Sequence, residues 1–160
     1  MPYLVDGNNL MHALAADGVD VGRLGLCRLL AALRKQGRKV RVVFDGPPPP
    51  PGLARQIDET GVAVDYSAAR SADELIVEHI NADSAPRRLT IVSTDRELRK
   101  AARRRRCEHI TSQDFARMLI EIDQRRQSAA AAHRSEPKEK RHGLTEEQTR
   151  RWLREFGFDD

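Results

Sequence analysis

The sequence predicts an α/β fold built around a parallel sheet, and three observations lead to that prediction. Short apolar runs alternate with longer segments in which apolar residues return every three or four positions. The apolar residues of the run 39–44 stand together, which is typical of a strand covered on both faces. Asp6, Asp45, Asp73 and Asp95 are separated by 39, 28 and 22 positions, each roughly one strand–helix crossover. Strands that alternate with helices in this way form parallel sheets with right-handed crossovers.

The first part of the chain accounts for three strands and three helices. We expect the strands at 2–6, 39–44 and 62–66, and the helices at 10–15, 21–36 and 53–60. Asp20 is placed to cap the helix 21–36. Asp6–Asn9 is interpreted as a loop at the carboxyl end of the first strand. Residues 46–52 contain five consecutive prolines between two glycines and are predicted to form a stiff polyproline segment, not a helix.

Two capping boxes organise the second part of the chain. Ser71 with Glu74 opens a helix that runs to about residue 82, and Thr94 with Glu97 opens a helix at 95–106. Ser112 is expected to cap the last helix of the domain. We expect the remaining strands at 88–93 and 107–110, and that last helix at 113–126.

The composition changes after residue 127, and this change sets the predicted domain boundaries. Residues 1–127 form the predicted α/β domain. Residues 128–142 are small, charged and weakly periodic, so we interpret them as a flexible linker. Residues 143–160 are predicted as a C-terminal helical segment, because Trp152 and Phe156 fall on one apolar stripe.

Charge and cysteine content indicate a partner and a compartment. The net charge is +4 and the sequence pI is about 9.4, which favours a polyanionic partner. Cys27 and Cys107 have no metal-type or disulfide-type spacing, so we expect buried free thiols in a reducing cytosol. No apolar stretch approaches the length of a membrane span, and the first residues do not resemble a signal peptide. A cytoplasmic location without a membrane partner is predicted.

Four aspartates are expected to meet at one edge of the sheet, where ligands of open parallel sheets bind. These residues are Asp6, Asp45, Asp73 and Asp95, and Asn9 adds an amide oxygen. Each like-charge pair at about 4 Å and an effective dielectric near 20 raises the energy by about 4 kcal/mol, which a bound cation would offset. Because the donors are oxygens only, the hard ions Mg²⁺ or Mn²⁺ are indicated.

Each acid also has a purely structural interpretation. Asp73 and Asp95 stand in first turns of predicted helices, where a carboxylate interacts favourably with the helix dipole. Asp6 and Asp45 precede glycine, where aspartate is a common turn residue. Their convergence on one edge of a basic protein favours phosphodiester chemistry, in which metal ions activate a water and stabilise the leaving oxygen.

Four motifs resemble the YacP-like branch of the NYN domains, within the PIN-like nucleases. They are Leu4-Val5-Asp6-Gly7-Asn8-Asn9, Val43-Phe44-Asp45-Gly46, Ser71-Ala72-Asp73-Glu74 and Ser93-Thr94-Asp95-Arg96-Glu97. The resemblance covers about residues 1–126. One departure is Asn8, where the branch usually has an aromatic residue.

The resemblance implies a fold, a site and a substrate. The fold would be a three-layer α/β/α sandwich with a central parallel sheet. The site would be a metal centre formed by Asp6, Asn9, Asp45, Asp73 and Asp95, in which the four aspartates are catalytic. The activity would be an endoribonuclease acting on cytoplasmic RNA, with ribosome-linked decay of mRNA in this branch.

A dense basic cluster lies at the end of the predicted helix 95–106. It consists of Arg99, Lys100, Arg103, Arg104, Arg105 and Arg106. The cluster is interpreted either as an RNA phosphate track or as a solvated helix end whose cations suit the dipole. Arg38, Lys39 and Arg41 are predicted at the opposite end of the second strand from Asp45, far from any scissile phosphate.

Three alternatives to a nuclease follow from the same pattern. An RNA- or ribosome-binding adaptor on this fold would lack the chemistry, and metal titration would identify it. A phosphatase of the haloacid dehalogenase type requires a second aspartate two positions after the first, but position 8 is asparagine. A phosphate-accepting receiver domain requires paired acids after the first strand.

Overall fold

A five-stranded parallel sheet forms the centre of the structure, a computed structural model that describes residues 1–135. The strands are β1 (Tyr3–Asp6), β2 (Val40–Phe44), β3 (Ala63–Tyr66), β4 (Thr90–Val92) and β5 (Glu108–Ile110). Their order across the sheet is β3-β2-β1-β4-β5, and every neighbouring pair is parallel. The carboxyl ends of all five strands therefore lie on one edge.

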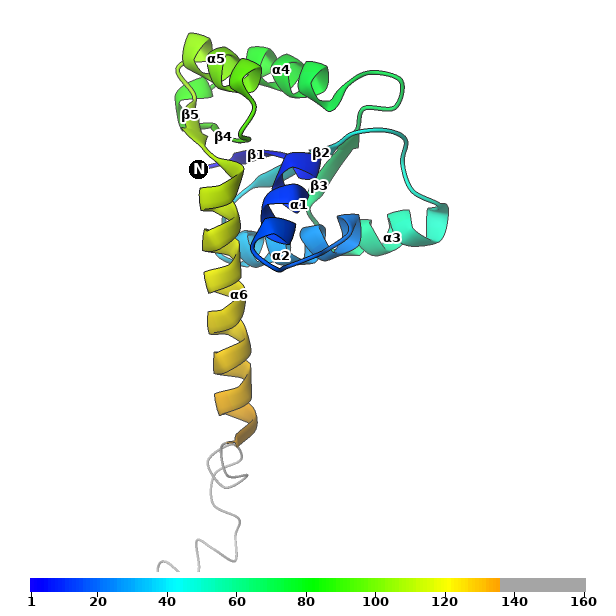
Figure 1. The fold of residues 1–160 in the computed structure, drawn as a ribbon, viewed down its shortest axis with the longest axis vertical. Coiled ribbons are helices and arrows are strands. Elements are labelled where there is room, and N and C mark those ends of the chain that lie inside the picture. The colour runs from blue at the N-terminus through cyan, green and yellow to red at the C-terminus, as the bar shows by residue number, and fades with distance from the viewer. Residues whose placement is uncertain (136–160) are drawn as a thin grey trace, which may run out of the picture. The chain divides into compact units, whose positions relative to one another are not determined.

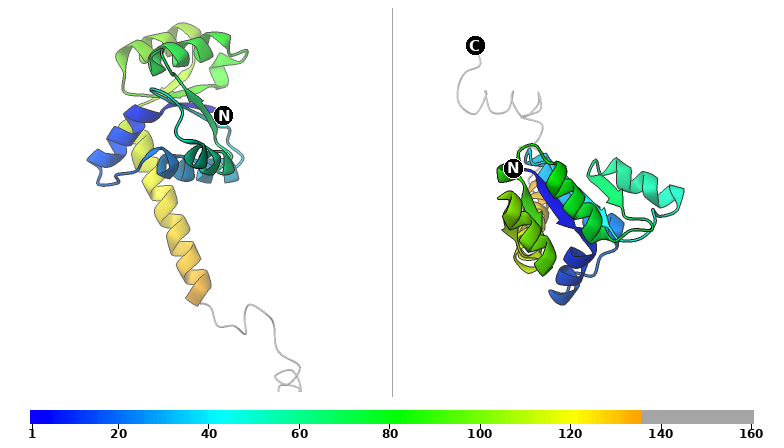
Figure 2. Two further views of the ribbon diagram at one scale, coloured as in Figure 1. Left: turned by 90° about the vertical axis from the view of Figure 1, so that its right-hand side faces the viewer. Right: turned by 90° about the horizontal axis from the view of Figure 1, so that it is seen from above.

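Helices cover both faces of this sheet, so the predicted three-layer α/β/α sandwich is confirmed. Helices α1, α2 and α3 lie on one side of the sheet, and α4 and α5 lie on the other (Figures 1 and 2). The bounds are α1 Gly7–Ala16, α2 Arg23–Lys35, α3 Pro51–Glu59, α4 Ala72–Ala82, α5 Arg96–Arg105 and α6 Ser112–Ser135, with a 3₁₀ turn at Pro86–Arg88.

Each face of the sheet has its own apolar core, because alternate strand residues point to opposite sides. Val5 and Val42 pack with Leu10, Leu30 and residues of α6 such as Phe115. On the other side, Leu4, Val43 and Ile91 pack with Ile76, Ile80 and Leu98 of α4 and α5. The apolar stripes of the helices thus match the two-sided burial that the sequence predicts for the central strands.

Two predictions about helix starts in the first part of the chain are wrong. Asp6–Asn9 is not a loop: α1 begins at Gly7, because the Asp6 side chain caps the helix by accepting a hydrogen bond from the Asn9 amide. Asp20 does not cap α2, which begins at Arg23 after Gly22 without a side-chain cap.

The proline run also differs in part from its prediction. Pro51 and Gly52 begin α3 instead of ending a polyproline segment. Proline is favoured at the first helical position, because its fixed φ suits the helix and its missing N–H would be unpaired there in any case.

The capping predictions of the second part are only partly correct. The capping box of Ser71 and Glu74 is confirmed. In α5, however, the N-cap is Asp95 and not Thr94. In α6, the Thr111 hydroxyl accepts from the Asp114 amide, whereas the buried Ser112 hydroxyl has no hydrogen-bond partner among the described residues.

Helix α6 continues to Ser135, beyond its predicted end at 126. Residues 128–135 are therefore helical where a flexible linker is predicted, and their alanines favour that state. By their internal contacts, residues 1–123 form one compact unit, which ends within α6. The rest of the predicted linker and the segment 143–160 lie outside the described residues.

The two cysteines are free thiols, as predicted, but they differ in burial. Cys27 is fully buried, and burial raises its pKa to about 12, so it remains a thiol at neutral pH. Cys107 is only half-buried, against expectation. Within residues 1–135, no helix combines the length and the apolar character that crossing a bilayer requires.

Candidate active site

The acidic residues gather at the carboxyl end of β1 and its neighbours. The strand order reverses here, because β2 and β3 lie on one side of β1 and β4 and β5 lie on the other. Ligands of open parallel sheets bind at the carboxyl ends of the strands at such a point. Asp6 is the last residue of β1, Asp45 follows β2, and Asp95 follows β4. Asp73 comes from the first turn of α4, the helix that follows β3.

Asp6 is the buried centre of the group, with 6% of its surface exposed. Its Oδ1 accepts from the Asn9 amide at 3.2 Å, and its Oδ2 accepts from the Ser93 hydroxyl at 3.0 Å. Burial raises the pKa of Asp6, and the charges of Asp73 and Asp95 raise it further, against the two hydrogen bonds, which lower it. Ionised Asp6 is therefore held in an environment that disfavours its charge.

Ser93 connects Asp6 to Asp95. Its fully buried hydroxyl donates to Asp6 Oδ2 and accepts from the Asp95 amide at 3.0 Å. Asp95 Oδ1 in turn accepts from the amides of Glu97 and Leu98, at 2.7 and 3.0 Å, as the cap of α5. One oxygen of Asp95 is thus used for capping, and Oδ2 has no hydrogen bond to the described residues.

Asp45 is fixed by the loop after β3 and by the start of α4. Its Oδ1 accepts from the Ser67 hydroxyl at 3.0 Å and from the Ala72 amide at 3.1 Å. Ser67 also accepts from the Gly46 amide at 2.9 Å. The Asp45 carboxylate therefore lies at the amino end of α4. The Ala72 amide that donates to it directly precedes Asp73 in the chain.

Arg23 of α2 holds the backbone on the other side of Asp45. Its guanidinium donates to the carbonyls of Asp45 and Pro47, at 2.6 and 2.9 Å, and lies 5.4 Å from the ring centre of Phe44. Sequence reasoning missed both Arg23 and Ser67. Ser67 follows directly after a strand, which could have suggested it, but Arg23 carries no sequence signal.

Asn8 and Asn9 tie α1 to the loops on either side. Asn9 Oδ1 accepts from the Thr94 amide at 3.2 Å, and Asn8 Oδ1 accepts from the Asp45 amide at 3.4 Å. These bonds span the gap between β2, β1 and β4. Both asparagines therefore have a structural role. The side-chain oxygen of Asn9 already accepts one hydrogen bond, from the Thr94 amide.

Asp73 completes the electrostatic coupling of the four acids. Partial burial raises its pKa first, and the charges of Asp95 and Asp45 raise it further. Asp6 is affected by the charges of Asp73 and Asp95. Repulsion thus links Asp73 to each of the other three carboxylates, and Asp6 to Asp95.

The oxygen donors of this group suit a hard divalent ion, but they are not arranged as a finished cage. Within residues 1–135, no three acids, histidines or cysteines are placed as a ready metal-binding group. The carboxylates are instead held by capping and hydroxyl hydrogen bonds. Oδ2 of Asp45, Oδ2 of Asp95 and both carboxylate oxygens of Asp73 have no hydrogen bond to the described residues, whereas each oxygen of Asp6 already accepts one.

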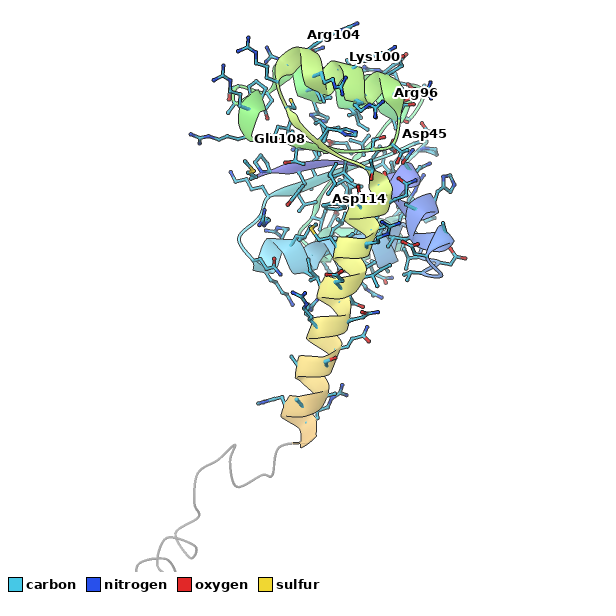
Figure 3. The ribbon with its side chains drawn as sticks, turned by 60° about the vertical axis from the view of Figure 1, so that its left-hand side comes forward. Asp45, Arg96, Lys100, Arg104, Glu108 and Asp114 are labelled. Carbon is cyan, nitrogen blue, oxygen red and sulfur yellow. The ribbon has the colours of Figure 1, made fainter. Side chains whose placement is uncertain are left out.

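The basic cluster lies on α5, directly after Asp95. Arg99, Lys100, Arg103 and Arg104 are exposed. Figure 3 shows Arg96, Lys100 and Arg104 following one another along this helix; Arg96 was not predicted as part of the cluster.

The last two arginines of the cluster differ from the others: Arg105 has a structural role, and the exposed Arg106 follows the last turn of α5. Arg105 is half-buried, and its guanidinium donates to the carbonyls of Asp83 and Ile80, at 3.0 and 3.4 Å. Arg106 ends α5 in the left-handed conformation, with φ 58°. Arg105 is therefore a poor choice for an RNA contact, whereas the exposed members of the cluster can reach a ligand.

Comparison with known proteins identifies relatives of this architecture. The family model of the YacP-like NYN domain matches residues 3–156. The crystal structure of a tryptophan-to-leucine mutant of Rae1 (YacP) from Bacillus subtilis is similar, with a TM-score of 0.64 and 21% identity over 86% of this chain and 85% of that one. The structure of Rae1 (YacP) itself matches with a TM-score of 0.63 and 21% identity over 84% and 82%. No curated protein matches the chain.

Proposed function

Because the chain belongs to the family of YacP-like NYN domains, which are nuclease-like, we propose that it is an endoribonuclease that depends on a divalent metal ion. Its substrate would be RNA, with mRNA at the ribosome as the specific target. Its location would be the cytoplasm.

The observation that carries this proposal is the coupling of four carboxylates at the reversal of strand order. Burial raises the pKa values of Asp6 and Asp73, and the charges of neighbouring aspartates raise them further. A cation between the carboxylates would offset that repulsion. Mg²⁺ or Mn²⁺ would be held by Asp6, Asp45, Asp73 and Asp95, with the side-chain oxygen of Asn9 as a further ligand. Such an ion supplies an activated water and stabilises the leaving oxygen of the phosphodiester.

The residues around the carboxylates would fix their positions for this chemistry. Ser93 orients Asp6, Ser67 orients Asp45, and Arg23 holds the backbone that carries Asp45. Because these groups are locked by hydrogen bonds, little reorganisation is needed when the ion and the RNA bind. The chain has few aromatic residues, so RNA contacts would be mainly to the backbone phosphates.

The direct test is incubation of the full chain with mixed cellular RNA, with and without Mn²⁺, followed by mapping of the new RNA ends. We expect internal cuts only when metal is present. Equal cutting after the metal is chelated, or intact RNA in both samples, would overturn the proposal.

A second candidate is an RNA-binding adaptor without catalysis. It is favoured by one observation: Asp6 and Asp95 both act as helix caps, so their presence does not require a metal. Calorimetric titration with Mn²⁺ separates the two candidates, because the adaptor would show no saturable binding at the acidic edge.

The exposed cations of α5 are expected to bind RNA phosphates. We predict that Arg103→Gln with Arg104→Gln weakens RNA binding and reduces the slope of log affinity against log salt by about 0.7–1 unit per lost phosphate contact. Arg105 is left unchanged because it holds carbonyls of α4 and the following loop. The matched control is Arg28→Gln with Lys35→Gln, which removes the same charge from exposed positions of α2. Equal slopes for the two double variants would mean that RNA does not run along α5.

A further inference from the structure

A pocket of 360 Å³ lies at the amino edge of the sheet, opposite the acidic residues. Its walls come from the beginnings of β1, β2 and β3 and from Leu89 before β4. The carboxyl-terminal parts of α2 and α4 contribute Arg34, His79 and Asp83. Neither the nuclease chemistry nor the basic cluster of α5 uses this pocket.

The polar groups of the pocket are mostly cationic. Arg34, Lys39 and Arg41 line it, against one lining carboxylate, that of Asp83. Within residues 1–135, neither Arg34 nor Lys39 takes part in an ion pair. Two cations without partners at one concave site create a positive potential that favours an anion.

Arg41 interrupts the otherwise buried strand β2, and its side chain is held in place. In the sheet register it stands between Leu4 and Ala63. Its Nη1 donates to Asp65 Oδ2 at 2.6 Å, and His79 Nε2 donates to the same oxygen at 2.9 Å. One acceptor oxygen is thus shared by two donors. The fork of an arginine has five N–H donors, so most of those of Arg41 remain for a ligand.

Arg34 is placed at the pocket by a glycine. Gly61 has a φ of +70°, and a Cβ at this position would overlap Arg34 Nη1. The guanidinium therefore lies directly against the backbone at the start of the β3 segment. A side chain at position 61 would displace it, so glycine leaves the room that this cation occupies in the lining of the pocket.

Apolar residues also line the pocket. Leu4 and Leu89 come from the core on one face of the sheet, Val40 comes from the core on the other face, and the small Ala63 is exposed. A pocket lined by apolar residues and a few placed charges is the usual form of a small-molecule site. Guanidinium groups match the oxygens of a phosphate in geometry and charge.

We propose that this pocket binds the phosphate of a mononucleotide, or the same group at the phosphorylated end of an RNA, between Arg34, Lys39 and Arg41. The apolar part of the lining then contacts the base. This site is separate from the acidic edge, so its existence does not depend on the proposed nuclease activity. The shared chemistry is a terminal phosphate monoester beside a flat apolar group.

The test is calorimetric titration of the full chain with adenosine monophosphate, in the presence of a chelator so that no divalent ion contributes. We expect saturable one-site binding, and much weaker binding of adenosine, which lacks the phosphate. Equal binding of the two compounds, or no saturable binding of the monophosphate, would overturn the proposal.

Variants locate the binding. Arg34→Gln with Lys39→Gln removes two cations that have no structural partner, and we expect a loss of affinity of about tenfold or more. The control variant Arg28→Gln with Lys35→Gln removes the same charge from α2 outside the pocket and should bind as the wild type does. Asp6→Asn should also bind normally. Equal losses in the two double variants, or loss of binding in Asp6→Asn, would place the phosphate elsewhere and refute the pocket.

A further pair of ligands distinguishes the two sources of the phosphate. A short RNA with a 5′-phosphate and the same RNA with a 5′-hydroxyl are titrated into the wild type and into Arg34→Gln with Lys39→Gln. Preference for the phosphorylated RNA that the double variant loses supports an RNA end as ligand. Binding of the mononucleotide without such a preference supports the free nucleotide.

Discussion

Asp6→Asn is expected to abolish metal-dependent RNA cleavage and to leave the metal-free protein at least as stable as the wild type. Asparagine caps helices as well as aspartate does, so the start of α1 is preserved. The Ser93 hydroxyl, which now donates to Asp6, can accept from the new amide instead. The variant removes a buried charge that neighbouring acids disfavour and, with it, a proposed metal ligand.

Thermal melts with and without Mn²⁺ test this expectation. The wild type should gain stability from Mn²⁺ by mass action, and Asp6→Asn should gain little. The control Asp20→Asn changes an exposed aspartate that caps no helix, and it should cleave RNA normally. If Asp6→Asn melts lower without metal and still cleaves RNA with it, the carboxylate is structural and the nuclease assignment fails.

The raised pKa values of Asp6 and Asp73 also set the sign of a pH effect. A carboxyl group whose pKa is higher in the folded state binds its proton more tightly there, so its contribution to stability is present at low pH and is lost as the pH rises through the folded pKa. Both pKa values lie above 3.8. On acidification from neutral pH, the metal-free wild type should therefore gain stability relative to Asp6→Asn. An unchanged difference between the two would contradict the burial of charge at Asp6.

Gly7→Ala is the second change with a large expected effect. A Cβ at Gly7 would lie 2.5 Å from Phe44 Cδ1 and 2.9 Å from Val42 Cγ2. Both neighbours are fully buried in β2, an interior strand of the sheet, so they cannot move aside freely. We expect a loss of about 1–3 kcal/mol in the free energy of unfolding, the usual effect of overpacking a core, although alanine is the better helix former.

Gly52→Ala is the matched control for this prediction. Gly52 also stands in the first turn of a helix, but a Cβ there would meet no atom within 4 Å. The same substitution should therefore stabilise the protein by about 0.4–1 kcal/mol, because it restricts the unfolded chain. Denaturant unfolding of both variants measures the difference. Effects of the same sign would show that close packing under α1 is not what requires glycine at position 7.

The edge on which the acids meet could be predicted from the sequence, because it follows from the parallel alternation of strands and helices. The capping box at Ser71 was predictable for a related reason: its partner is only three residues away. Thr94 shows the limit of such local reasoning. Its hydroxyl donates to Gln113 of α6, a tertiary contact, and does not cap α5. Asp95 is the N-cap of α5 instead.

The supporting residues of the site could not be predicted, since their partners are distant in sequence. Arg23 donates to the carbonyls of Asp45 and Pro47, and neither bond leaves a pattern in the residue types nearby. Arg41 was recognised as distant from the acids, but its shared contact with Asp65 and His79 depends on how α4 crosses the sheet. The geometry of the fold, more than local preference, decides these contacts.

The hydrogen bond between Ser93 and Asp6 joins residues 87 positions apart, and this separation affects the order of folding. Contacts between distant residues close large loops and form late, after local pairings. Strands β1, β2 and β3 and the start of α4 come from the first half of the chain and bring three of the four aspartates. Asp95 and Ser93 arrive only when β4 docks beside β1. Any form of the chain in which β4 is not docked would lack the complete acidic edge, so a bound ion would stabilise only the finished domain.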